Sequence, residues 1–161
     1  MAAYDLTRLK RLVIIYRTIQ VALVGLFLFM AYNFILLFGR QGTPEFFTKA
    51  LLLAMVVQLL LLYPAWWLAG RDLAVEVEAG LVGITPEQLV TLRRRRLLGD
   101  LWKLSALGFF IVFIIMVPDA GKGRGVSLIL AASYFSFLLA TLTYLQCFNL
   151  RAGRKRKELS G

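Results

Sequence analysis

The sequence predicts an all-α integral membrane protein: a four-helix transmembrane bundle with both termini in the cytoplasm and a cytoplasmic helical extension that leads into the third span. The first observation is composition. Apolar residues make up 60% of the 161 residues and the mean hydropathy is +0.74, whereas soluble domains are about 45–50% apolar. A chain this short does not bury so much apolar surface in one core, but a bilayer solvates it. The second observation is that the apolar residues fall into four runs, so residues 1–161 form one transmembrane domain.

The first apolar run covers residues 12–38, and the 21 residues from Thr18 onward carry no formal charge. About 20 apolar residues are needed to cross the hydrocarbon, so this run predicts one span. It is too long for a signal peptide, and no small-residue cleavage site follows it before Gly39. We therefore expect the segment to stay attached.

The second span is predicted at residues 46–68. Thr43, Pro44 and Glu45 precede it in the order of a hydroxyl cap, a proline at the first helical position and an acid at the positive end of the helix dipole. Pro64 removes an internal hydrogen bond in the last turns of this run, so we expect a kink there.

The longest polar stretch, residues 70–100, is predicted to be a cytoplasmic loop. Its second half opens with Thr85, and Gln88 follows three residues later, which is the spacing of a capping box and predicts a helix from Pro86. No strong breaker separates this helix from the third apolar run, residues 101–118. One long helix should therefore begin in the cytoplasm and enter the membrane.

The last part of the chain contains the fourth span and a basic tail. Residues 119–125 include three glycines and predict a flexible hairpin connection. The fourth span, residues 126–150, contains no Lys, Arg, Asp or Glu. The tail, residues 151–161, is basic and polar, and we expect it to be too short to fold alone.

The basic residues predict the orientation. Of the 19 lysines and arginines, 15 lie in the N-terminal segment, in residues 70–103 or in the tail. The other four are Arg40, Lys49, Lys122 and Arg124. The positive-inside rule then places both termini in the cytoplasm. Short outer connections and the lack of any Asn-x-Ser/Thr acceptor favour a bacterial inner (cytoplasmic) membrane.

Composition also excludes several classes of site. The chain has no histidine and a single cysteine, Cys147, so a haem, a zinc site or a disulfide is not expected. No acid lies in the middle of a predicted span, which disfavours proton-coupled carriers. The acids near the two interfaces show no familiar catalytic spacing. We therefore predict a non-enzymatic protein without a cofactor or metal.

A run of four arginines, residues 93–96, is the most conspicuous charged feature. Successive helical residues point about 100° apart, so these side chains form a collar around the helix and not one docking face. A collar near the membrane suits the anionic headgroups of the inner leaflet, and nucleic acid is not expected as a partner. The residues predicted to contact anionic lipid or a partner protein are Arg93, Arg94, Arg95, Arg96, Lys103, Arg154, Lys155, Arg156 and Lys157.

Two further sets of residues are predicted to act within the spans. Polar side chains in the first two spans either join helices by hydrogen bonds or line a pore; they are Arg17, Gln20, Asn33 and Gln58. Small side chains at three- and four-residue spacing in the fourth span predict a helix-packing face; they are Ser133, Ser136, Ala140, Thr143 and Cys147.

Together these features favour a small, non-enzymatic membrane protein that acts as an oligomeric or accessory subunit, either as a homo-oligomer or within a larger membrane complex. Its basic cytoplasmic region would contact anionic lipid or the partner. Two alternatives stay open: an oligomeric ion channel or small-solute transporter, for which the basic inner mouth suggests an anion, and an interfacial lipid-modifying enzyme.

Overall fold

The computed structural model describes residues 7–81, 83, 85–116 and 124–160, with some side chains of α3 and α4 excepted. This part of the chain forms four helices and no strand. They are α1 (Thr7–Arg40), α2 (Glu45–Glu78), α3 (Pro86–Met116) and α4 (Arg124–Ser160). The predicted all-α class is confirmed.

In the described part of the chain, three helices are long and apolar enough to cross a membrane: α1, α2 and the Leu128–Leu159 part of α4. They contain the first and second predicted spans and residues 128–150 of the fourth. The third predicted span, residues 101–118, lies in α3 except for its last two residues, which fall outside the described part of the chain. Most of the predicted hairpin at residues 119–125 also falls outside it.

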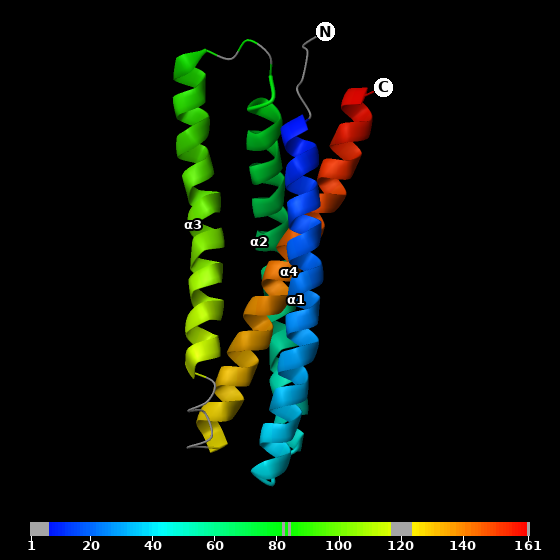
Figure 1. The fold of residues 1–161 in the computed structure, drawn as a ribbon, viewed down its shortest axis with the longest axis vertical. Helices are drawn as coiled ribbons and strands as arrows, with labels where there is room; N and C mark the ends of the chain where they lie inside the picture. The colour runs from blue at the N-terminus through cyan, green and yellow to red at the C-terminus, as the bar shows by residue number, and fades with distance from the viewer. Residues whose placement is uncertain (1–6, 82, 84, 117–123, 161) are drawn as a thin grey trace.

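Helix α4 is central to the packing. It crosses the molecule obliquely, and α2 packs against it more extensively than any other helix pair in the described chain (Figure 1). Helix α1 also packs on α4, whereas α3 contacts its neighbours much less. The start of α1, the link from α2 to α3 and the end of α4 lie at one end of the molecule. We call this the basic end, because it carries Arg8, Lys10 and Arg11 of α1 and the arginine-rich end of α4.

Helix α2 differs from its predicted form at both ends. Pro44 occupies the N-cap position and the expected hydroxyl cap from Thr43 is not made; the Thr43 carbonyl instead accepts a hydrogen bond from the Phe46 amide at 3.0 Å. The reason is the preceding turn, in which Gly42 adopts a φ of +70° and the Thr43 amide bonds back to α1. At its other end α2 continues past residue 68 to Glu78.

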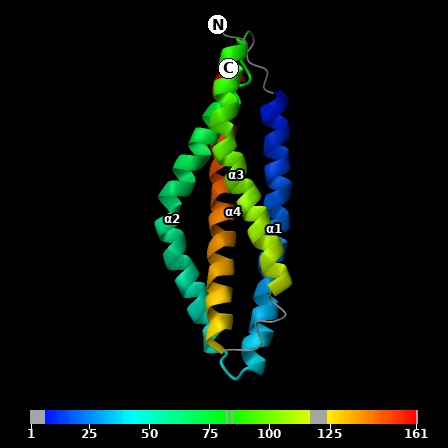
Figure 2. The same ribbon diagram turned by 90° about the vertical axis from the view of Figure 1, so that its left-hand side faces the viewer.

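Residues 70–100 are therefore mostly helical. They comprise the end of α2, a short connection in which Gly83 has a φ of +95°, and the first half of α3. The predicted capping box is present: the Thr85 amide donates to Gln88 Oε1 at 3.2 Å, and the Gln88 amide donates to Thr85 Oγ1 at 3.4 Å. Helix α2 contains Pro64 and is visibly bent along its length (Figure 2).

The basic tail does not behave as expected either, since residues 151–160 continue α4. The preceding turns already supply a helix nucleus, so each added residue costs only its own ordering. Ala152 is buried, and Lys155 pairs with Glu158 one turn later at 2.9 Å. These contacts favour continuation of the helix.

The half of the molecule away from the basic end is held by an aromatic cluster. Phe34 of α1 is 1% exposed, and its ring centroid lies 5.6 Å from that of Phe135 and 6.4 Å from those of Phe113 and Tyr134. One α1 ring thus contacts rings from both α3 and α4. Ala50 and Ala54 give α2 a flat surface against the same cluster.

We predict that Phe34→Ala destabilises the protein by roughly 3 kcal/mol, because the lost ring leaves a cavity that three helices line. The measurement is thermal unfolding in mild detergent. Leu60→Ala is the control, since Leu60 is 73% exposed on α2. Equal losses for the two variants would contradict the packing described here.

Candidate functional site

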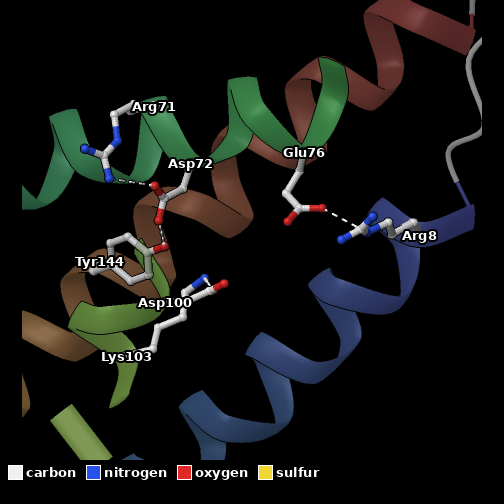
Figure 3. A network of polar contacts seen from close by, with 7 residues as sticks. All are labelled: Arg8, Arg71, Asp72, Glu76, Asp100, Lys103 and Tyr144. Atoms are coloured by element: carbon white, nitrogen blue, oxygen red, sulfur yellow. Dashed lines mark hydrogen bonds and ion pairs between the residues drawn. The ribbon is translucent and has the colours of Figure 1, made fainter. Parts of the chain in front are cut away.

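Two buried carboxylates lie on the last turns of α2. Asp72 and Glu76 are one helical turn apart, so they share a face, and they are 8% and 9% exposed. Asp72 accepts a hydrogen bond from the Tyr144 hydroxyl of α4 at 2.7 Å and from the neighbouring Arg71 at 3.2 Å. Glu76 pairs with Arg8 of α1 at 3.2 Å, and Figure 3 shows Arg8 reaching toward it.

Helix α3 brings a third ion pair to the same place. Lys103 lies 3.5 Å from Asp100, and its ammonium is 5.4 Å from the ring centroid of Tyr16 in α1. Lys103, Tyr16, Asp72 and Glu76 also line a cavity of about 10 Å³, close to the smallest space that holds one water. We call Arg8, Arg71, Asp72, Glu76, Asp100, Lys103 and Tyr144 the charge network (Figure 3).

The approach of α3 to this network depends on a missing side chain. Gly99 is buried, and a Cβ built on it would lie 2.5 Å from Asp72 Oδ2 and 2.9 Å from Oδ1. Any larger residue would force α3 away from α2 or displace the carboxylate. Gly99 therefore sets how closely α3 packs against the charge network.

The network balances three cations against three carboxylates. Burying an unpaired carboxylate is costly, and hydrogen bonds and opposite charges offset that cost. The partners come from different helices: Arg8 from α1, Tyr144 from α4, and the Lys103 pair from α3. The network thus joins all four helices through ion pairs and the Tyr144–Asp72 hydrogen bond.

A second polar contact joins α2 and α4 beside the network. The guanidinium carbon of Arg151 in α4 lies 3.8 Å from the ring centroid of Trp66 in α2. Within α2, the guanidinium carbon of Arg71 lies 5.6 Å from the ring centroid of Trp67. The Arg151 guanidinium occupies the space where a side chain on Gly70 would lie. Such cation–π contacts contribute about 0.5–1 kcal/mol each where they are exposed.

The polar residues predicted within the spans mostly bond across helices. The Gln20 amide of α1 donates to Gln146 at 2.7 Å and accepts from Asn149 at 3.2 Å, both on α4. The Gln58 amide of α2 donates to the Thr143 hydroxyl of α4.

The other two members of this set do not make contacts of that kind. The Asn33 amide donates to the Phe29 carbonyl of its own helix at 2.8 Å. Arg17 has an exposed side chain. The structure therefore brings Gln20 and Gln58 into helix contacts with α4 and leaves Arg17 on the outer surface of α1.

The residues of the predicted small-residue face of α4 differ in their burial and contacts. Ala140 is buried, and Thr143 and Cys147 are half-buried, with Thr143 bonded to Gln58 of α2. The Ser136 hydroxyl donates to the Ala132 carbonyl of its own helix at 2.7 Å, and Ser133 is exposed.

The basic residues lie mainly on the surface. Arg94 and Arg95 are exposed, and Arg95 approaches Glu78 at 3.9 Å. The side chains of Arg93 and Arg96 lie outside the described part of the structure. On the tail, Lys155 is paired with Glu158, and the exposed cations are Arg154, Arg156 and Lys157.

Sequence reasoning missed the charge network. It treated Asp72 and Glu76 as interfacial acids, because the apolar run ends before them. Their spacing of four residues and the absence of a breaker after Gly70 were the available signals, since together they favour continuation of α2 with both acids on one face. Tyr144 gave no signal of its own, because nothing in the sequence pairs it with Asp72.

Among the described residues, no group of three His, Cys, Asp or Glu side chains lies close enough to hold a metal ion. Each buried carboxylate of the network already has a cationic or hydroxyl partner. The network is suited to positioning helices.

Comparison with protein-family models, with curated proteins and with solved structures finds no match to this chain. The geometry of its own residues must therefore carry any functional proposal.

We predict that Gly99→Leu lowers the melting temperature in detergent, because the new side chain clashes with Asp72 and separates α3 from α2. Gly108→Leu on the same helix is the matched control, since nothing lies within 4 Å of a Cβ built at Gly108. Leucine has the higher helix propensity by roughly 0.8 kcal/mol, so the control should be neutral or more stable. A similar change in both variants would mean that α3 does not approach Asp72 closely.

We also predict that Tyr144→Phe destabilises the protein by about 1–2 kcal/mol, because it removes the hydroxyl donor from a buried carboxylate. Tyr63→Phe, at a tyrosine that is 71% exposed, should have no measurable effect. Thermal unfolding of both variants in the same detergent tests this. If Tyr144→Phe unfolds at the wild-type temperature, the Asp72 contact is not needed for stability.

Proposed function

We propose that the chain is a non-enzymatic integral membrane protein of a bacterial inner membrane, built as a four-helix transmembrane bundle with both termini in the cytoplasm. It acts as an oligomeric or accessory subunit, and its basic end contacts anionic lipid or a partner protein. Three helices that are long and apolar enough to span a membrane support this placement. Helix α3 runs along the same axis beside them and carries the third apolar run (Figure 1).

The observation that carries the proposal is a set of hydrogen bonds between polar side chains of different helices. Gln20 bonds to Gln146, Gln58 to Thr143, and Asp72 to Tyr144. In lipid, hydrogen bonds of this kind join helices, because apolar side chains gain nothing by leaving hydrocarbon for each other. Because these side chains bond to neighbouring helices, they favour a structural role for the protein over a pore or an active site.

The distribution of charge supports the proposed orientation. The basic end carries the exposed cations of α1, α3 and α4, including Lys10, Arg94 and Arg156. The opposite end of the described chain carries Arg40 and Lys49. Under the positive-inside rule the basic end faces the cytoplasm, where each basic residue near anionic lipid contributes about 1 kcal/mol.

The exposed apolar faces of α1 and α2 are the surfaces for lipid or for a partner helix. Leu28 and Phe29 of α1 and Leu59, Leu60 and Tyr63 of α2 are all more than 60% exposed. Exposed apolar side chains on these two helices suit either acyl chains or the spans of another subunit.

The test is purification of the full chain from its native membrane in mild detergent, followed by mass measurement. We expect the protein mass of the particle, without its bound detergent, to exceed that of one 18.2 kDa chain. The particle would be either a homo-oligomer or a complex with another membrane protein. Compartment-specific labelling of tags on the two ends should report the cytoplasm for both. A strictly monomeric protein without a partner, ion flux in reconstituted liposomes, or tags in opposite compartments would contradict the proposal.

A further inference from the structure

A cavity of about 290 Å³ lies between α1, α3 and α4. Its walls include Ile19 and Leu23 of α1 and Ala106, Leu107 and Phe110 of α3, and Lys103 is the lining residue of α3 nearest the basic end. We call this space the lateral cavity. Its lining is almost wholly apolar, and Lys103, whose ammonium faces Asp100 and Tyr16, stands at one end of it.

The lateral cavity opens toward the side of the molecule. Leu107 is 58% exposed and Ile19 is 42% exposed, although both line it. Helices α1 and α3, which form two of its walls, pack against each other less than any other helix pair. In the proposed membrane placement, an apolar opening between these two loosely packed helices faces acyl chains and not water.

The size of the cavity limits the occupant. Small-molecule sites are commonly about 300–1,000 Å³, so this one has room for part of a single acyl chain and not for a bulky ligand. A helix of a second subunit, about 10 Å across with its side chains, is also too large. A single hydrocarbon chain that enters from the bilayer fits both limits.

The charges near the cavity select the headgroup. Asp72 and Glu76 already have Arg71 and Arg8 as partners. The Lys103–Asp100 pair is different, because Asp100 is half exposed and the separation is 3.5 Å; pairs of this kind contribute little. Lys103 can therefore exchange part of that contact for a phosphate.

Additional cations lie at the same end of α1, on faces other than the one that lines the cavity. Lys10, Arg11 and Arg17 are exposed on α1, and they add positive potential beyond the balanced charge network. An anionic headgroup is favoured there and a cationic one is repelled.

We propose that the lateral cavity binds one acyl chain of an anionic phospholipid from the inner leaflet, with the lipid phosphate beside Lys103. The site rests on the proposed membrane placement and orientation, and it adds a defined lipid position to the general contact of the basic end with anionic headgroups.

Native mass spectrometry of the delipidated full chain in detergent tests the site, with phosphatidylglycerol and phosphatidylcholine of identical chains as equimolar probes. The wild type should retain one phosphatidylglycerol in preference to phosphatidylcholine. Ala106→Trp, which fills the cavity, should abolish retention. Leu104→Trp is the matched control, because Leu104 lies on the same helix, is 65% exposed and does not line the cavity; it should behave as the wild type.

The headgroup contact has its own variants. Lys103→Gln should reduce the preference for phosphatidylglycerol about fivefold, and Lys103→Arg should keep it. These two Lys103 variants still test the lipid site if Ala106→Trp fails to fold. Equal retention of both lipids by the wild type, or equal losses in Ala106→Trp and Leu104→Trp, would overturn the site.

The outcomes for the lipid site and for the proposed function are separable. A monomer without a partner that still binds phosphatidylglycerol selectively would remove only the subunit role. An oligomer with both tags in the cytoplasm and no selective lipid would remove only the lateral site.

Discussion

The burial of Asp72 and Glu76 on α2 is the constraint on which the arrangement of the basic end depends. Two carboxylates one turn apart cannot be withdrawn from water without partners, and α2 alone supplies only Arg71. The remaining partners come from α1 and α4, through Arg8 and Tyr144. Helix α3 approaches through the surface of Gly99, which lacks a side chain. The relative positions of the helices at this end thus follow from satisfying two acids.

Each half of the molecule has a buried apolar cluster, and at the basic end polar contacts are added to it. Away from the basic end, Phe34 and its aromatic neighbours interlock with the small side chains of Ala50 and Ala54. Helices in lipid gain little from apolar contact as such, so close packing and ring geometry must supply the stability there. At the basic end, ion pairs and the Arg151–Trp66 contact add to a second buried apolar cluster, in which the Tyr16 and Phe148 ring centroids lie 4.8 Å apart. Helix α4 takes part in both halves, which explains why it is the most enclosed helix.

Sequence reasoning succeeded where the signal was local. The all-α class, the helix start at Pro86 and the reciprocal bonds of Thr85 and Gln88 depend on residues within one turn of each other. It failed where tertiary partners decide. The extension of α2 to Glu78 is stabilised by Arg8 and Tyr144, which are remote in sequence, and the helical tail depends on the preceding turns of α4. Gln58 was identified as a residue needing a partner, but only the structure selects Thr143.

The continuous helix of α4 has a mechanical consequence. Its 37 residues measure about 55 Å, roughly 25 Å more than the hydrocarbon thickness. The terminal cations are consequently mounted on a stiff rod, and they cannot sweep a volume as the charges of a disordered tail do. Each one is held at a fixed position along and around the helix axis. A binding partner would meet charges in a fixed helical arrangement, whose orientation is set by the preceding turns of α4.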